Sequence, residues 1–167
     1  MDSKIQALVE SIHRSPSMAV LVVTGAGGNA LSWVLGVAGA SRTVLDARIP
    51  YSSAALDDFT GSVLGQSASQ ETAAKMARSA YDRAVCLRQG DVPVVGVACT
   101  ASIASDRPKR GAHRCHIASW ASDGLETYRV EFVKGLRDRT GEDKIVSQLV
   151  LKALAQAVGV DSDIDLG

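Results

Sequence analysis

The stretch AVLVVTGAGGNALSWVLGV, Ala19 to Val37, decides the fold. Its first residues belong to a continuous apolar run, MAVLVV. Such a run is typical of a central strand in a parallel sheet, whose side chains are buried on both faces of the sheet. The turn TGAGG follows, and a helix is expected from about Asn29 to Leu35. Strand, glycine turn and helix in this order indicate an α/β protein. Thr24 is the only hydroxyl in the turn, and three roles stay open for it: nucleophile, phosphate contact or helix cap.

Composition indicates one globular domain. The chain has 167 residues, of which 46% are hydrophobic and 22% charged, enough for a core of its own. We expect a single domain over residues 1–160 and a frayed acidic tail over 161–167. Lys plus Arg equals Asp plus Glu, at 18 each, so charge gives no reason to expect a nucleic-acid partner. Positive charge gathers only in RPKRGAHR, Arg107 to Arg114.

Apolar runs and cysteines indicate a soluble protein of the cytoplasm. No apolar run approaches the roughly 20 residues that a membrane helix needs, and the N-terminus lacks a signal-peptide core. The three cysteines, Cys86, Cys99 and Cys115, show no CxxC spacing and suit reduced thiols that fill the core.

The rest of the chain alternates helical and extended patterns, with short turns between them. Strands are expected over Thr43–Ile49, over VPVVGVACTASIAS, and over HRCHIASWA and ETYRVEFV, which are joined at SDG; helices are expected over Ser3–His13, after a cap at Ser69, and over DKIVSQLVLKALAQAVG. In the helix after Ser69, small residues form a narrow stripe that allows close packing on a sheet. The prediction is an α/β layered fold, with a mostly parallel, mixed-edge sheet flanked by helices.

Ligands of such sheets bind beyond the carboxyl ends of the strands. Three segments should meet there: Thr24–Gly28, Pro50–Ser53 and Thr100–Arg110. GAGG lacks the full GxGxxG spacing and a Walker lysine, so it fits either an anion site at a helix N-terminus or a tight structural turn. RPKRG fits either a solvated loop or a phosphate contact.

A metal site is not expected in HRCH. Side chains alternate along a strand, so His113 and Cys115 share one face while His116 takes the other. The sequence supplies no second ligand pair.

The order of these segments resembles the CinA C-terminal domain family, whose best-known members are nicotinamide mononucleotide deamidases. The resemblance runs from about Ile5 to Val158 and rests on TGAGG, GASRTVLDARIPYS, SASQETAAKMA, GVACTAS and the terminal helix. Eukaryotic CinA-like modules, which carry similar PYS and RPK segments, are more similar still. These modules often precede a nucleotidylyltransferase-like domain, so the resemblance implies such a partner in the same chain or a separate one, and a homo-oligomer.

The resemblance implies a reaction that needs neither a metal nor an organic cofactor. Thr24 stands where the family has its serine nucleophile and would attack the carboxamide of a pyridine nucleotide. Backbone N–H groups of Gly27 and Gly28 would stabilise the oxyanion, and Tyr51 would orient the substrate or relay a proton. The remaining substrate- or phosphate-binding residues that it implies are Gly25, Ser52, Thr100, Lys109 and Arg110.

One position departs from the family. Shortly after the tyrosine the family has a lysine that can activate the nucleophile, and this chain has Leu56. A hydroxyl without a neighbouring base is a poor nucleophile. Two interpretations follow: a divergent amidohydrolase, or a nucleotide-binding or oligomeric assembly module without catalysis.

Overall fold

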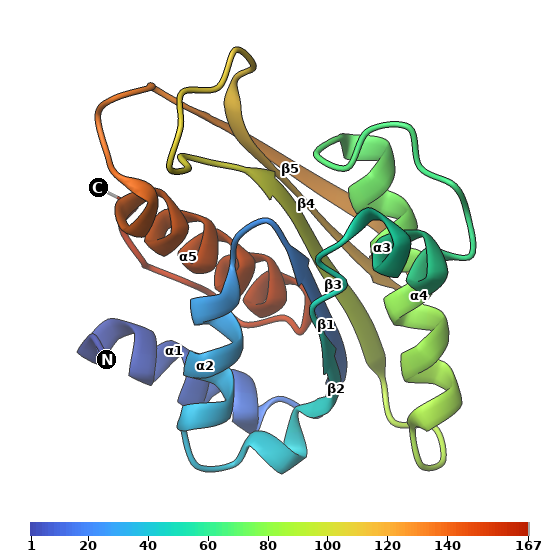
Figure 1. Cartoon of the computed structure of the whole chain (residues 1–167). Helices are drawn as coiled ribbons and strands as arrows, with labels where there is room; N and C mark the ends of the chain where they lie inside the picture. The colour runs from blue at the N-terminus through green and yellow to red at the C-terminus, as the bar shows by residue number, and fades with distance from the viewer. Residues whose placement is uncertain (167) are drawn as a thin grey trace.

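The computed structural model describes residues 1–166, which form a five-stranded mixed sheet between two layers of helices (Figure 1). The strands lie in the order β2-β1-β3-β4-β5. Strands β1, β2 and β3 are parallel, whereas β4 and β5 form an antiparallel hairpin at one edge. The strand bounds are Met18–Thr24 (β1), Val44–Arg48 (β2), Val94–Ser102 (β3), His113–Ala121 (β4) and Gly124–Phe132 (β5). The predicted α/β class and the mixed edge are confirmed.

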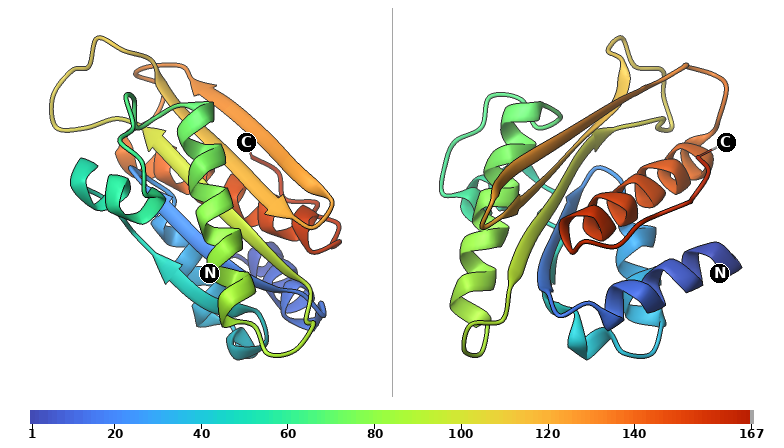
Figure 2. Two further views of the ribbon diagram at one scale, coloured as in Figure 1. Left: turned by 90° about the vertical axis from the view of Figure 1, so that its right-hand side faces the viewer. Right: turned by 180° about the vertical axis from the view of Figure 1, so that it is seen from behind.

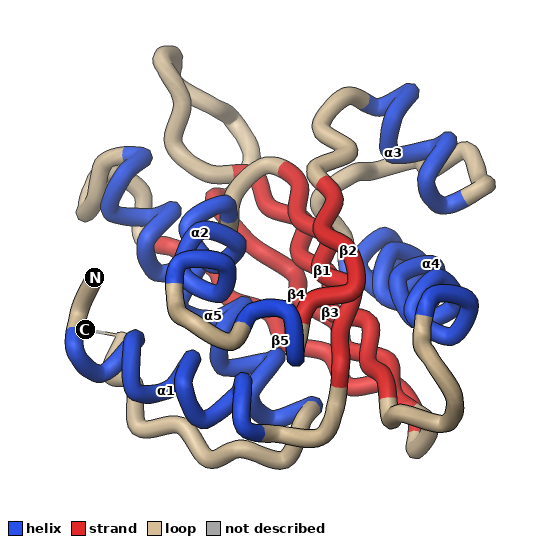
Figure 3. Tube along the Cα trace, turned by 90° about the horizontal axis from the view of Figure 1, so that it is seen from below, coloured by secondary structure: helices blue, strands red, loops and turns tan. Residues whose placement is uncertain are grey.

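The helices cover both faces of the sheet. Helices α1, α2 and α5 lie on one face, and α3 and α4 lie on the other (Figures 2 and 3). Their bounds are Ser3–Arg14 (α1), Gly28–Gly36 (α2), Ser53–Thr60 (α3), Gln70–Leu87 (α4) and Arg139–Ala157 (α5), with a 3₁₀ turn at Ala40–Arg42.

Strand β1 divides its side chains between two hydrophobic cores because successive side chains point to opposite faces. Leu21 and Val23 pack with α1, α2 and α5, and Val20 and Val22 pack with α4. Burial of every residue from Ala19 to Thr24 matches the central, two-sided strand that the apolar run predicts.

Helix α4 lies unusually close to the sheet. A Cβ atom at Gly96 in β3 would stand 2.4 Å from the Tyr81 backbone nitrogen and 2.5 Å from the Ala77 carbonyl oxygen. The fully buried Ala73, Ala77 and Ala80 leave room for this approach. The expected small-residue stripe is therefore confirmed.

Side-chain caps define the helix N-termini that the sequence signals. Ser69 Oγ accepts from the Thr72 backbone N–H at 3.1 Å and begins α4, as predicted. Asp138 Oδ1 accepts from the Gly141 N–H at 2.8 Å. Helix α5 therefore begins at Arg139, a few residues earlier than its apolar periodicity indicates.

Three expectations differ from the structure. Helix α3 has no counterpart in the sequence prediction, because it is short and buries only Leu56. Cys86 is exposed on α4, so only Cys99 and Cys115 fill the core. Residues 161–166 of the expected frayed tail have no helix or strand, yet Ile164 is 5% exposed and its carbonyl accepts from Lys152 Nζ at 3.1 Å; Gly167 lies outside the described residues.

Membrane insertion by a helix has no support in residues 1–166, where each helix is too short or too polar to cross a bilayer.

Candidate functional site

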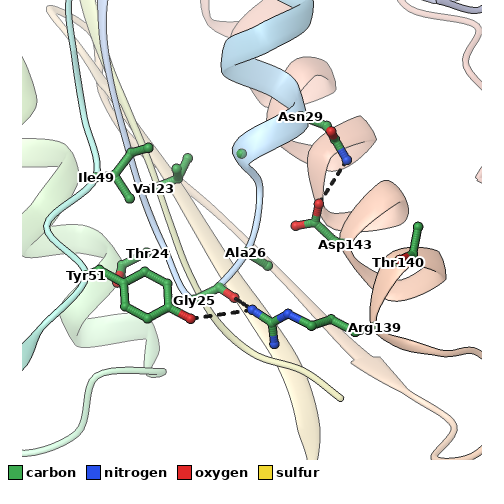
Figure 4. A pocket seen from close by; sticks show the side chains of 11 residues that line it. Val23, Thr24, Gly25, Ala26, Asn29, Ile49, Tyr51, Arg139, Thr140 and Asp143 are labelled. Atoms are coloured by element: carbon green, nitrogen blue, oxygen red, sulfur yellow. Dashed lines mark hydrogen bonds between the residues drawn. The ribbon is translucent and has the colours of Figure 1, made fainter. Parts of the chain in front are cut away.

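A pocket of about 450 Å³ lies where the carboxyl ends of β1 and β2 face the N-termini of α2 and α5 (Figure 4). This volume is in the range of small-molecule sites. Its lining comes from three stretches of the chain: Val23, Thr24, Gly25, Ala26, Gly28, Asn29, Ile49, Tyr51, Arg139, Thr140 and Asp143. Two of the three predicted segments therefore meet here, and α5 supplies a part that the sequence prediction lacks.

Gly25 holds the turn after β1 against β3. Its φ is +81°, and a Cβ atom there would stand 1.9 Å from the Ala101 carbonyl oxygen. Only glycine fits both the left-handed conformation and this approach. Gly25 is thus a structural requirement of the turn as well as a lining residue.

Thr24 is the last residue of β1 and lines the pocket, with 5% of its surface exposed. It does not cap α2, whose N-cap is Gly27 without a side-chain hydrogen bond. Within residues 1–166 the Thr24 hydroxyl has no hydrogen-bond partner. The capping role is therefore wrong, and the hydroxyl is available to a ligand.

Arg139, the first residue of α5, reaches across the pocket mouth. Its Nη2 donates to the Gly25 carbonyl at 3.1 Å and to the Tyr51 hydroxyl at 3.4 Å (Figure 4). Its Nη1 donates to the Ala104 carbonyl at 2.9 Å. All three acceptors are neutral. No carboxylate in residues 1–166 forms an ion pair with this guanidinium, so its charge stays available to an anion.

Asp143 already accepts a hydrogen bond from the Gly27 backbone N–H, one of the two donors that the predicted oxyanion role requires. Its Oδ1 accepts from the Gly27 N–H at 2.8 Å, and its Oδ2 accepts from Asn29 Nδ2 at 2.9 Å. The predicted oxyanion donor Gly27 is therefore already bonded to a carboxylate. Gly28 lines the pocket and begins α2, so its N–H is the remaining donor of the predicted pair.

Tyr51 and Ile49 form an apolar wall. They are 64% and 58% exposed, and both line the pocket just beyond β2. An exposed aromatic ring in a pocket offers a stacking surface to a planar base. Ser52 does not line the pocket; its Oγ caps α3 by accepting from the Ala55 N–H at 3.1 Å.

The other predicted phosphate contacts lie outside this pocket. Thr100 is 1% exposed and its Oγ1 donates to the Ser67 carbonyl at 2.5 Å. Lys109 Nζ donates to Ser102 Oγ at 3.1 Å, and Arg110 is exposed on the same loop. Burial, followed by the Arg139 charge, lowers the pKa of Lys109, and Lys109 does not line the pocket.

Leu56 lies on the face of the sheet toward which Thr24 points. Alternation along β1 puts Thr24 on the same side as Val20 and Val22, and Leu56 packs in the same core as these valines. Leu56 is 2% exposed and offers no proton acceptor. The pocket lining contains neither lysine nor histidine.

A buried pair supports the loop that holds Arg139. Glu142, which is fully buried, accepts from the Ala104 N–H at 2.7 Å through Oε2 and lies 3.0 Å from His113 Nδ1 through Oε1. The Ala104 carbonyl accepts from Arg139, so the backbone N–H and the carbonyl of Ala104 both have hydrogen-bond partners on α5.

Several solved structures have the same fold. The crystal structure of CihA, a competence/damage-inducible protein from Agrobacterium tumefaciens, superposes with a TM-score of 0.69 at 24% identity, covering 95% of this chain and 96% of that one. A competence or damage-inducible protein from Enterobacter asburiae gives 0.69 at 17% identity over 95% and 98% of the two chains. A CinA superfamily protein from Enterobacter cloacae gives 0.66 at 19% identity over 95% and 93%.

In sequence comparisons, neither a protein-family model nor a curated protein matches the chain. The structural likeness extends over nearly the whole length of both chains. The chain therefore has the same α/β fold as these three structures.

Proposed function

We propose that the pocket binds a pyridine mononucleotide, with nicotinamide mononucleotide as the representative compound. The main support for this proposal is the guanidinium of Arg139 at the pocket mouth. Its hydrogen-bond partners are neutral, and it forms no ion pair in residues 1–166. Guanidinium groups bind phosphate through paired donors. The resemblance to the deamidase family supports the choice of nucleotide.

The rest of the pocket supports a compact, flat ligand. The ring of Tyr51 and the side chain of Ile49 supply a stacking wall, and the volume of about 450 Å³ suits a mononucleotide. Asp143 adds a negative charge one helical turn from Arg139. A ligand with a cationic ring and an anionic phosphate matches both charges.

Calorimetric titration tests the binding proposal. Nicotinamide mononucleotide and nicotinamide riboside differ by the phosphate, so the unsubstituted chain should bind the mononucleotide about tenfold more tightly. Arg139→Gln should remove this difference, and Arg88→Gln, at the far end of α4, should preserve it. Equal affinity for the two compounds, or no binding of either, would refute the proposal.

A second candidate is hydrolysis of the bound carboxamide, and the Thr24 hydroxyl without a partner favours it. The hydroxyl would attack the carboxamide carbon, ammonia would leave, and water would release the acyl group. Without the amine that Leu56 replaces, the rate should be low.

An ammonia-release assay separates this candidate from binding alone. Thr24→Val keeps the branched shape and removes the hydroxyl, whereas Thr24→Ser keeps the hydroxyl. Release that Thr24→Val abolishes and Thr24→Ser retains supports hydrolysis. Binding without release identifies a nucleotide-binding module.

A further inference from the structure

Asp143 carries a negative charge, and no ion pair within residues 1–166 neutralises it. It lies in the second turn of α5, is half-buried, and lines the pocket (Figure 4). Its two hydrogen-bond donors, the Gly27 N–H and the Asn29 amide, are both neutral. No Lys, Arg or His in residues 1–166 forms an ion pair with it.

The same carboxylate keeps spare acceptor capacity toward the pocket. Each carboxylate oxygen accepts more than one hydrogen bond, and each Asp143 oxygen here receives one from the chain. A ligand N–H group can therefore bond to Asp143 without displacing Gly27 or Asn29. A ligand carboxylate at that place meets a like charge and finds no donor on Asp143.

We propose that Asp143 is a specificity-determining residue, which makes the pocket prefer a carboxamide over a carboxylate on the pyridine ring. This inference rests on the proposed function. Arg139 and Asp143 lie four residues apart on α5, so they share a helix face and are separated by about one turn. With the phosphate at Arg139, the ring end of the ligand lies toward Asp143.

The expected preference follows from charge. Nicotinamide mononucleotide and nicotinic acid mononucleotide share the cationic ring and the phosphate, and differ in the carboxamide or carboxylate alone. Two like charges about 5 Å apart in a pocket open to solvent weaken binding about tenfold. The carboxamide also donates two N–H groups, which the acid lacks.

Calorimetric titration of the two nucleotides tests the inference on the full chain. The unsubstituted chain should bind the amide about tenfold more tightly than the acid. Asp143→Asn keeps an oxygen for the Gly27 N–H and removes the charge, so the preference should fall below about twofold. Asp123→Asn removes an equal charge from the exposed β4–β5 turn and should leave the preference intact.

The outcomes separate the two proposals. Binding of both nucleotides with an unchanged ratio in Asp143→Asn overturns the role of Asp143 and leaves the proposed function standing. The same holds for tighter binding of the acid by the unsubstituted chain. If neither nucleotide binds to the unsubstituted chain, both the proposed function and the inference are overturned. If Asp143→Asn fails to fold, Asp143→Ser provides the same comparison, because it also removes the charge and keeps an oxygen.

Discussion

Replacing Gly25 by alanine should destabilise the chain far more than an ordinary left-handed glycine would. Two effects add at this position. An L-residue with φ near +81° costs about 1 kcal/mol. In addition, the new Cβ would stand 1.9 Å from the Ala101 carbonyl oxygen, which belongs to the backbone of β3 and cannot rotate away.

The size of the second effect follows from that distance. An ordinary C···O contact is about 3.3 Å, so the turn after β1 has to move about 1.4 Å from β3. Such displacements cost about 2 kcal/mol in packed interiors, giving a total of about 3 kcal/mol. For a chain of this length the melting temperature should fall by about 9 °C.

Gly61→Ala is the matched control. Gly61 ends α3 with φ +70°, and a Cβ there meets nothing within 4 Å, so only the conformational cost of about 1 kcal/mol remains. Differential scanning calorimetry should record a fall of about 3 °C for this variant. Equal losses of stability in the two variants would show that the close approach to Ala101 is not what requires glycine.

Further predictions concern packing, the helix start and pH. Gly96→Ala puts a methyl group 2.4 Å from backbone of α4 and should lower the free energy of unfolding by about 3 kcal/mol in urea titrations; a loss below 1 kcal/mol contradicts the close packing. Gly28→Ala, where a Cβ meets nothing within 4 Å, should leave stability unchanged or raise it by up to about 1 kcal/mol, and a clear loss contradicts this. Burial lowers the pKa of His13 below its ordinary 6.5, so the unfolded chain binds more protons between the folded pKa and 6.5, and stability should fall as the pH drops through that window. His13→Gln should reduce the difference between urea midpoints at pH 7.5 and 5.5, with the rest due to His116, whose pKa burial also lowers; an unchanged difference excludes His13 as a source.

The strands could be predicted because their residues are uniform in character. The apolar run into β1 and the strict alternation in β5 are local signals, and each specifies a strand without knowledge of its neighbours. Helix α3 gives no such signal. It has eight residues, too few to show a full apolar repeat, and only Leu56 is fully buried. Its start depends on a Ser52 cap that also fits a turn.

Side-chain partners could not be predicted, since they depend on how segments that are far apart in sequence come together. Thr100 lies near the carboxyl end of β3, where a phosphate contact could stand, but its hydroxyl donates to the Ser67 carbonyl of the loop before α4. Ser52 likewise lies beside the pocket and serves its own helix. The rule that ligands bind beyond the carboxyl ends of parallel strands locates the pocket and leaves these choices open.

The charges of the pocket come from α5, for which the sequence analysis predicts a helix and names no site residue. Arg139 and Asp143 follow the Asp138 cap and stand four residues apart on α5, a spacing that puts both on one face of the helix. The four-residue spacing can be read from the sequence. The segment that this helix face contacts, the turn after β1, lies more than 100 residues earlier in the chain, so the contact itself cannot be read from it. Because α5 supplies one cation and one anion, the pocket has no net charge of its own, and neither a purely anionic nor a purely cationic ligand matches it. A ligand that carries both charges about one helical turn apart satisfies the two residues together, which is why the ring charge and the phosphate of a pyridine nucleotide have to be tested as a pair.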